Sequence, residues 1–306
     1  MNRILSMSTR VLVLAAMCLL GSMPAQSQPA AQRVFDSPDA AADALIAAAK
    51  TDDQAALVAI FGAKHRDRIG TVDKARDREL RARFARMAEE YGLLHPEPDG
   101  SVSLVVGYEA WPFPIPLVKE GSGWRFDTEA GIEEVINRRI GENELAAIET
   151  LRAYVDAQRQ YAAKPRDGTK VRQFAQKVRS LPGKKDGLYW AADPAKGEEV
   201  SPAGPLIRDP GTRAPGAPYN GYYFKILTRQ GPAAPGGAYS YIINGRMVAG
   251  YAMVAYPAQY GGTGVMTFLV NHYGTVYQKD LGPKTAQRAA AIHEYNPDAS
   301  WREVPD

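Results

Sequence analysis

The chain has 306 residues, of which 45% are hydrophobic, and its 37 basic residues nearly balance its 34 acidic ones, giving a formal charge of +3. A nucleic-acid partner is therefore not expected, because such proteins carry a marked basic excess or stripe. Acidic or small apolar residues interrupt the local basic clusters at 64–68 and 78–86, which is typical of solvated helix faces. The length is sufficient for one large hydrophobic core or two modest ones.

The first residues have the pattern of a signal peptide. Arg3 and Arg10 precede the apolar run "VLVLAAMCLL", and small and polar residues follow it. The run is about half of the roughly 20 residues that a membrane-spanning helix needs, and no later segment is apolar enough to span. We predict a signal peptide over residues 1–27, with cleavage after Ser27 and export to the periplasm or out of the cell; an uncleaved anchor is the alternative.

The only cysteine, Cys18, lies inside this apolar run. Met17 and Leu19 flank it, whereas a lipoprotein would need a small residue before the cysteine and a polar one after it. The mature chain would thus depend on packing and not on disulfides. The four histidines, at positions 65, 95, 272 and 293, include no pair at metal-ligand spacing, so neither a metal nor another cofactor is predicted.

Residues 28–128 predict an N-terminal α+β domain that begins with helices. Ser37 as N-cap and Pro38 at the first helical position mark the start of the first helix. Apolar spacings of three and four residues continue through two further helices, which end at Gly62 and Gly92. Three helices on one sheet would form a small layered, cone-like unit.

The strands of this domain are expected between residues 101 and 128. Three short β-rich runs lie there, and a glycine turn of hairpin length, "EGSG", joins the last two. Pro112, Pro114 and Pro116 remove alternate backbone donors, which no central strand tolerates. The strand that contains them is therefore expected at an edge of a curved antiparallel sheet, or held on one side only.

Residues 129–164 predict two connecting helices broken at Gly141. In the second helix Leu145, Ile148 and Leu151 repeat at helical spacing, so it presents one apolar face. We expect this face to pack on a sheet that comes later in the chain.

That sheet is expected in a C-terminal antiparallel-sheet domain over residues 165–306. A Pro- and Gly-rich loop at 181–218 comes first, and four or five strands with short turns follow. The fold class predicted for the whole chain is α+β: N-terminal helices on a curved antiparallel sheet, then a long helix packed on a second antiparallel sheet.

Two parts of the chain resemble known folds. The stretch "SPDAAADALIAAAKTDDQAALVAIFG", with the later "PLVKEGSGWRFD", resembles the cone-shaped nuclear transport factor 2-like fold over residues 35–128. That likeness implies a pocket, which members use for catalysis, for ligands or only for contact. The helix "NELAAIETLRAYVDAQRQYA", followed by "GYYFKI" and "GVMTFLVNHYGTVY", resembles the globular head of pilins and pseudopilins over residues 142–280. The pilin processing site and its long apolar helix are absent from the sequence, which puts filament assembly in doubt.

The mature chain as a whole resembles one family of exported bacterial proteins, domain of unknown function 2950. The likeness rests on long motifs in nearly every segment, among them "WPFPIPLVKEGSGWRFDTEAG", "GKKDGLYW" and "NGRMVAGYAMVAYPAQYG". It implies export and a two-part body, and it carries no activity or catalytic residues to this sequence.

The stretch from Gly262 to Gly282 gathers a histidine, two tyrosines, a lysine and an aspartate. Its alternation predicts two strands about a turn that places His272 at an exposed tip, with Val270 opposite Val276. A catalytic triad would need a nucleophile and an acid converging on His272, and no recognisable elbow lies nearby. We therefore interpret the stretch as a structural hairpin. The motif "GKKDGLYW" is likewise interpreted as a turn with a core tryptophan, with an anion or sugar site as the alternative.

Candidate binding residues gather at strand ends, where aromatic side chains bury large areas with few rotatable bonds. The candidates for ligand or partner binding are Tyr222, Tyr223, Arg246, Tyr256 and Tyr260, together with Trp111 and Trp124 of the first domain. A cone pocket, if present, would be lined by Trp111, Trp124 and Tyr91.

The function expected from the sequence is that of an exported, non-catalytic interaction or scaffold module, with another envelope protein as partner and no transmembrane anchor after signal cleavage. Two alternatives stay open: a small-ligand carrier that uses the N-terminal cone, and a hydrolase of unrecognised type. Contact predicts an exposed apolar patch near the second sheet. A carrier predicts a closed, partly polar cavity, and an enzyme predicts at least two converging titratable groups in a cleft.

Overall fold

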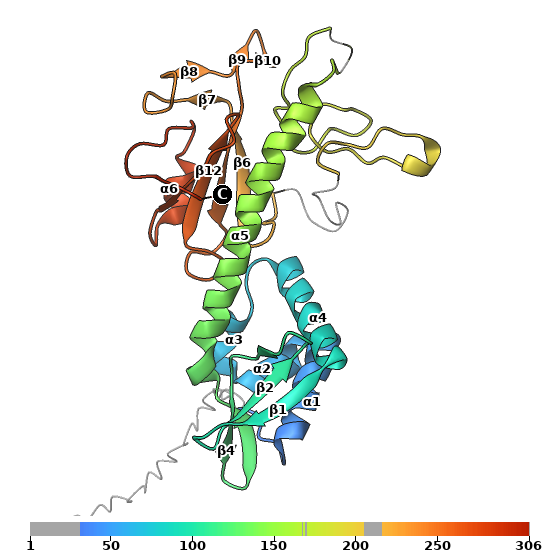
Figure 1. Cartoon of the computed structure of the whole chain (residues 1–306), viewed down its shortest axis with the longest axis vertical. Helices are drawn as coiled ribbons and strands as arrows, with labels where there is room; N and C mark the ends of the chain where they lie inside the picture. Colours follow the sequence, from blue (N-terminus) through green and yellow to red (C-terminus); the bar gives the residue numbers. More distant parts are fainter. Residues whose placement is uncertain (1–30, 167, 169, 205–215, 306) are drawn as a thin grey trace, which may run out of the picture.

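The computed structural model describes residues 31–166, 168, 170–204 and 216–305. The predicted signal peptide, with Cys18, and part of the predicted 181–218 loop lie outside these residues. Figure 1 shows two units stacked along the long axis of the molecule, with the helix α5 (Thr128–Ala162) running through both. Helices and antiparallel sheets build both units, which confirms the predicted α+β class.

The first unit begins with helices that their own side chains cap. Ser37, Asp53 and Asp73 each accept a hydrogen bond from the backbone N–H three residues later, at 2.9–3.1 Å. Pro38 occupies the first helical position, as predicted. The helices are α1 (Pro38–Lys50), α2 (Gln54–Phe61), α3 (Arg66–Ile69) and α4 (Lys74–Glu90), with a short 3-10 turn, η1 (Ala63–His65), before α3.

An antiparallel sheet completes the first unit. Its strands are β1 (Gly92–Pro96), β2 (Val102–Val106), β3 (Trp111–Pro112), β4 (Leu117–Glu120) and β5 (Gly123–Phe126). The order is β1-β2-β4-β5, and β3, which contains Pro112, pairs only with β2. Pro114 and Pro116 precede β4, which lies between β2 and β5, so the edge position expected for the strand that follows them is wrong. The strand β1 was not predicted, because its sequence, "GLLHP", is mostly exposed and is ordered by its pairing with β2.

The predicted break at Gly141 is wrong, since α5 is one continuous helix of 35 residues, about 50 Å long at 1.5 Å per residue. A glycine inside a helix costs about 1 kcal/mol relative to alanine. Burial on both sides of Gly141 outweighs that cost: Ile132 is buried in the first unit, and Leu151 and Val155 are buried in the second.

The second unit is a five-stranded antiparallel sheet in the order β14-β13-β12-β11-β6. The helix α5 contacts β11, β12 and β13, and α6 (Thr285–Ala290) also contacts β11, whose residues are nearly all buried. A long helix on a second sheet is thus confirmed. The strands are β6 (Tyr222–Leu227), β11 (Ala252–Pro257), β12 (Met266–Asn271), β13 (Val276–Asp280) and β14 (Arg302–Glu303).

Two short hairpins and one 3-10 turn complete this unit. They are β7 (Arg229–Gln230) with β8 (Tyr239–Ser240), β9 (Ile242–Ile243) with β10 (Arg246–Met247), and η2 (Pro194–Lys196).

Buried polar side chains connect the two units. The Nδ2 of Asn143, on α5, donates to the carbonyl of Thr263 at 3.0 Å, and the backbone N–H of Gly221 donates to Oδ2 of Asp73 at 2.9 Å. Glu144 accepts from two backbone N–H groups around the start of β12. Such bonds are directional, so they fix how the second sheet lies on the first unit.

Candidate functional site

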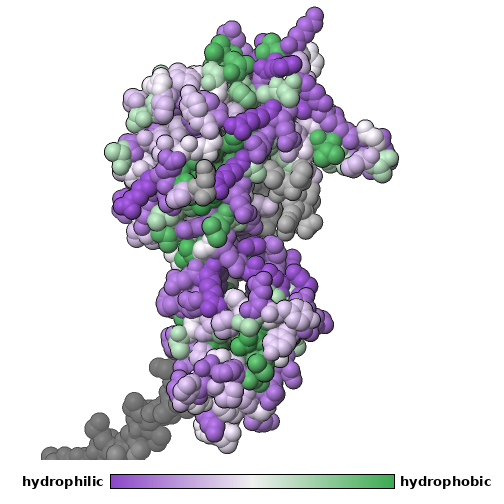
Figure 2. Space-filling model, in the orientation of Figure 1, coloured by the Kyte–Doolittle hydropathy of each residue, from purple (hydrophilic) through white to green (hydrophobic). Residues whose placement is uncertain are grey.

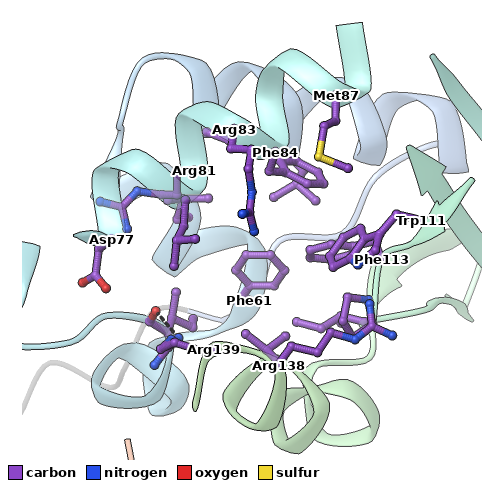
Figure 3. A pocket seen from close by; sticks show the side chains of 18 of the residues that line it. Phe61, Asp77, Arg81, Arg83, Phe84, Met87, Trp111, Phe113, Arg138 and Arg139 are labelled. Atoms are coloured by element: carbon purple, nitrogen blue, oxygen red, sulfur yellow. Dashed lines mark hydrogen bonds between the residues drawn. The ribbon is translucent and has the colours of Figure 1, made fainter. Parts of the chain in front are cut away.

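A cavity of about 500 Å³ lies in the first unit, between its helices, the segment around β3 and the first half of α5. Figure 3 shows it from close by, with aromatic rings along one side and arginines around it. Most of its lining is apolar: Leu45, Ala49, Leu57, Phe61, Ile69, Leu80, Phe84, Met87, Trp111, Phe113, Pro114, Ile115, Ile132 and Val135.

The helix α4 forms one wall of the cavity, because its apolar residues repeat at helical spacing. Leu80, Phe84 and Met87 follow one another at spacings of four and three, which places them on one face of the helix. This face points toward the aromatic cluster around Phe113, whose ring centre lies 5.2 Å from that of Phe84 and 6.2 Å from that of Phe61. The wall is therefore both apolar and well packed.

The opposite wall depends on a glycine. At Gly131, in the first turn of α5, an added Cβ would lie 2.3 Å from the carbonyl oxygen of Pro114 and 2.6 Å from Cα of Ile115. The helix can therefore approach this backbone only without a side chain at that position. The close approach brings Ile132 and Val135 into the cavity lining.

Charged residues also line the cavity, and most of them are paired. Arg81 binds Asp52, with Nε 2.7 Å from Oδ1, and Arg83 binds Glu142 at 2.6 Å. Burial would raise the pKa of Asp52, but hydrogen bonds from Arg78 and Arg81 outweigh it and lower the pKa.

Arg138 is held even more fully. It donates to Glu134 at 2.6 Å and to the carbonyl of Pro112 at 2.8 Å, and its guanidinium lies 4.8 Å from the ring centre of Trp111. These contacts use the charge of Arg138 and hold α5 against the segment that contains Pro112 and Trp111.

Arg139 differs from these three arginines. Its Nη2 donates to the backbone carbonyls of Arg68 and Ile69, at 3.2 and 2.9 Å, and among the described residues it forms no ion pair. Burial lowers its pKa, with partial compensation from the charge of Asp77. Asp77 itself accepts from the N–H and the hydroxyl of Thr71, at 2.7 and 2.8 Å.

A second, smaller cavity of about 220 Å³ lies where the two units meet. Arg139 also lines this cavity, together with Tyr260 and the turn Gln259–Gly262 of the second unit. The Tyr260 hydroxyl lies 3.2 Å from Oδ2 of Asp280. Arg139 thus stands between the apolar cavity and the junction of the units.

Of the three residues expected to line a cone pocket, the structure places only Trp111 in the cavity lining. Trp124 lies on β5, where its backbone pairs with Phe35 and Lys119 lies 5.6 Å above its ring. Tyr91 is exposed and packs beside Tyr108. These two residues are part of the scaffold and its surface.

The tyrosine candidates of the second unit fall into different environments. Tyr222 is fully buried and donates to the carbonyl of Met266 at 2.9 Å, so a partner cannot reach its ring. Tyr223 and Tyr256 lie opposite each other on β6 and β11, partly exposed, with ring centres 5.5 Å apart.

The remaining candidate, Arg246, is exposed and follows the tight Asn244–Gly245 turn, where both residues have positive φ. Neither Arg246 nor the Tyr223–Tyr256 pair lines either of the two cavities described above.

The predicted hairpin of residues 262–282 is present, with Val270 paired to Val276, but the exposed position expected for His272 is wrong. Tyr273 is the exposed side chain at the tip, whereas His272 is partly buried against the rings of Tyr241, Tyr251 and Tyr273. Burial lowers the pKa of His272, and its buried Nδ1 makes no hydrogen bond within the described chain. The imidazole packs against these three tyrosine rings, and this contact keeps it partly buried.

The "GKKDGLYW" motif holds an ion cluster on a buried tryptophan. Trp190 is buried, and the guanidinium of Arg166 lies 5.0 Å from its ring centre. Arg166, Lys164 and Lys185 all bind the carboxylate of Glu199, at 2.7–3.0 Å. Burial would raise the pKa of Glu199, but these three hydrogen bonds outweigh it and bring the pKa to about 2. Lys185 of the motif is thus paired with Glu199 of the same chain, which favours a structural role for the motif over an anion-binding or sugar-binding site.

A pH dependence follows from Glu199. An unfolded glutamate titrates near pH 4.3, so the cluster contributes stability above that pH and loses it as the pH falls toward 2. We expect Glu199→Gln to lower the thermal midpoint by about 2–4 °C at pH 7. The difference between variant and wild type should vanish near pH 2 in thermal scans over a pH series. An unchanged difference at both pH values would contradict this assignment.

Searches of curated proteins and of solved structures each gave no match. Over the described ranges, no three His, Cys, Asp or Glu side chains are grouped so that they could hold a metal ion. No helix of that part of the chain combines the length and the apolar character needed to cross a membrane. One family model matches nearly the whole chain, residues 32–304, and the chain therefore belongs to the family described as "Protein of unknown function (DUF2950)".

Proposed function

We propose that this protein binds a small, largely apolar molecule in the cavity of the first unit. The observation that carries the proposal is the cavity itself. Its volume of about 500 Å³ falls within the range of small-molecule sites, roughly 300–1,000 Å³, and apolar and aromatic side chains form most of its lining. The resemblance of residues 35–128 to the cone-shaped nuclear transport factor 2-like fold supports the same proposal, because many members of that fold hold ligands between helices and sheet.

A scaffold role has weaker support. On the face shown in Figure 2, hydrophilic residues cover most of the second unit, and the hydrophobic areas between them are small and separate. A contact surface would be expected to gather apolar side chains. The resemblance of residues 142–280 to pilin heads, with the Tyr223–Tyr256 pair, keeps partner contact as the alternative.

A hydrolase has the least support. It would need a nucleophile and a base or acid that converge in one cleft. The titratable side chains of the cavity are arginines and the acids Asp77, Glu109 and Glu142, with no Ser, Cys or His nucleophile among the described residues of the lining. Asp77 and Glu142 are held by Thr71 and Arg83. We propose a carrier or sensor in the periplasm or outside the cell, as the signal-peptide pattern of residues 1–27 predicts.

The test fills the cavity without disturbing the surface. Ala49 lines the cavity and is buried, so a phenylalanine there would occupy the space of a ligand. We expect Ala49→Phe to weaken binding of the neutral fluorescent probe N-phenylnaphthylamine about tenfold, with no lower thermal midpoint, because filling a cavity commonly stabilises a protein. Fluorescence titration measures the affinity.

The matched control is Ala47→Phe, which adds the same ring to an exposed position of the same helix. It should leave probe binding unchanged. Equal weakening by both variants, or no effect of Ala49→Phe, would place the probe elsewhere. Absence of probe binding to the wild type would make the contact alternative the better one.

A further inference from the structure

We propose that the molecule bound in the cavity is a single-chain amphiphile with an anionic head group, and that Arg139 binds this head group. The inference rests on the proposed function, since it names the chemical class of the ligand for the same cavity. Its first step is the charge balance of the cavity wall. Three of the four arginines there are paired with carboxylates: Arg81 with Asp52, Arg83 with Glu142 and Arg138 with Glu134. Arg78 shares Asp52 and Arg76 shares Glu142, so these pairs leave no excess negative charge.

Arg139 is the fourth arginine of the lining, and it forms no ion pair with the described residues. Its hydrogen bonds to the carbonyls of Arg68 and Ile69 both use Nη2, so its Nε and Nη1 make no hydrogen bond with the described residues. Arg139 is partly buried, and a partly desolvated charge is stabilised by further polar partners. The charge of Asp77 raises the pKa of Arg139, but both carboxylate oxygens of Asp77 accept hydrogen bonds from Thr71. Beside Arg139 the free polar capacity therefore consists of donors on a cation. Glu109, the remaining acid of the lining, is exposed and forms no hydrogen bond or ion pair with the described residues.

The cavity has a charged side and an aromatic side, so a ligand that fits it would have a polar end and an apolar end. In Figure 3, Arg139 lies on the same side as Asp77 and Arg81, while Trp111, Phe113 and Met87 lie on the other side. An alkyl chain among the aromatic rings would leave its head at the arginine side. A guanidinium attracts a carboxylate or phosphate by its charge and donates to its oxygens. Because Nη2 is already used, Nε and Nη1, which lie on different edges of the guanidinium, would each donate a single hydrogen bond.

Competition against N-phenylnaphthylamine tests this in the wild-type protein. The competitors are dodecanoate and dodecyl phosphate below their micelle concentrations, and dodecanol below its solubility limit. We expect the two anions to bind about tenfold more tightly than dodecanol, because a hydrogen bond to a charged group contributes strongly in a shielded site. The relative affinity of carboxylate and phosphate tells which head group fits better.

Variants assign the preference to one residue. Arg139→Gln should reduce the preference for the anions to less than about twofold while leaving dodecanol binding nearly unchanged, and Arg139→Lys should retain part of the preference. The control is Arg78→Gln, which removes the same charge from an exposed position on α4 outside the cavity lining. It should keep the full preference.

The outcomes separate the two proposals. If the wild type does not bind the probe, the proposed function fails. If the probe binds and Ala49→Phe weakens it, but no amphiphile displaces it, the cavity is a ligand site and the amphiphile proposal is overturned. If dodecanol binds the wild type as tightly as the anions, or if Arg78→Gln and Arg139→Gln act alike, the cavity binds apolar chains but the head-group assignment is overturned. The comparison in the wild type decides this even if Arg139→Gln does not fold.

Discussion

Gly131→Ala should lower the free energy of unfolding by about 3 kcal/mol, the upper part of the range for overpacking a closely fitted contact. The added Cβ would meet backbone atoms of Pro114 and Ile115 at 2.3–2.7 Å, and backbone cannot rotate away as a flexible side chain can. The variant should also weaken ligand binding, because Ile132 and Val135 would move out of the cavity wall together with α5. Urea denaturation followed by circular dichroism measures the first effect.

The matched control is Gly141→Ala in the same helix. Gly141 is exposed, and an added Cβ would meet nothing within 4 Å, so alanine should stabilise by about 0.5–1 kcal/mol through its higher helix propensity. Opposite signs at the two positions are the expected result. Destabilisation at both would mean that α5 does not continue through Gly141 in solution.

Asp73→Ala should cost about 2–4 kcal/mol, because one carboxylate has two structural roles. Its Oδ1 caps α4 by accepting from the N–H of Arg76, and its Oδ2 accepts from the buried N–H of Gly221 in the second unit. Loss of a cap typically costs about 1 kcal/mol, and an unsatisfied buried donor about 1–3 kcal/mol. Urea unfolding, monitored separately by tryptophan fluorescence and by circular dichroism, checks the magnitude.

Asp53→Ala provides the comparison, since Asp53 caps α2 through Ala56 and is exposed. Its loss should cost about 1 kcal/mol, the value for a cap alone. If Asp73→Ala costs no more than Asp53→Ala, the bond to Gly221 does not hold the two units together.

Local chemistry made much of the fold predictable from the sequence. Ser37 and Pro38, followed by apolar residues at helical spacing, mark the start of α1, and Pro112 lies in a strand that is paired on one side only. The strand β1 and the continuity of α5 through Gly141 were not predictable in the same way. Both depend on partners distant in sequence, namely the pairing of β1 with β2 and the packing of α5 on two separate cores.

The cavity was only partly predictable from the sequence, because its walls also come from segments that are distant in sequence. Trp111 was identified as a lining residue by its place in the expected cone, and the spacing of Leu80, Phe84 and Met87 could have indicated a shared face. The local sequence shows only that Glu134 lies four residues before Arg138 and Val135 four residues before Arg139; it does not show which groups Arg139 meets. Their difference arises because Glu134 lies one helical turn from Arg138, whereas Arg139 meets only backbone carbonyls.

The central claim is that the cavity of the first unit holds an apolar chain, and a crystal structure with ω-bromododecanoate tests it most directly. The anomalous signal locates the bromine without assumptions about the protein. The predicted result is a bromine peak among Phe84, Trp111 and Phe113, with the carboxylate at Arg139. Bromine bound only at the surface, beside a cavity without ligand density, would contradict the account.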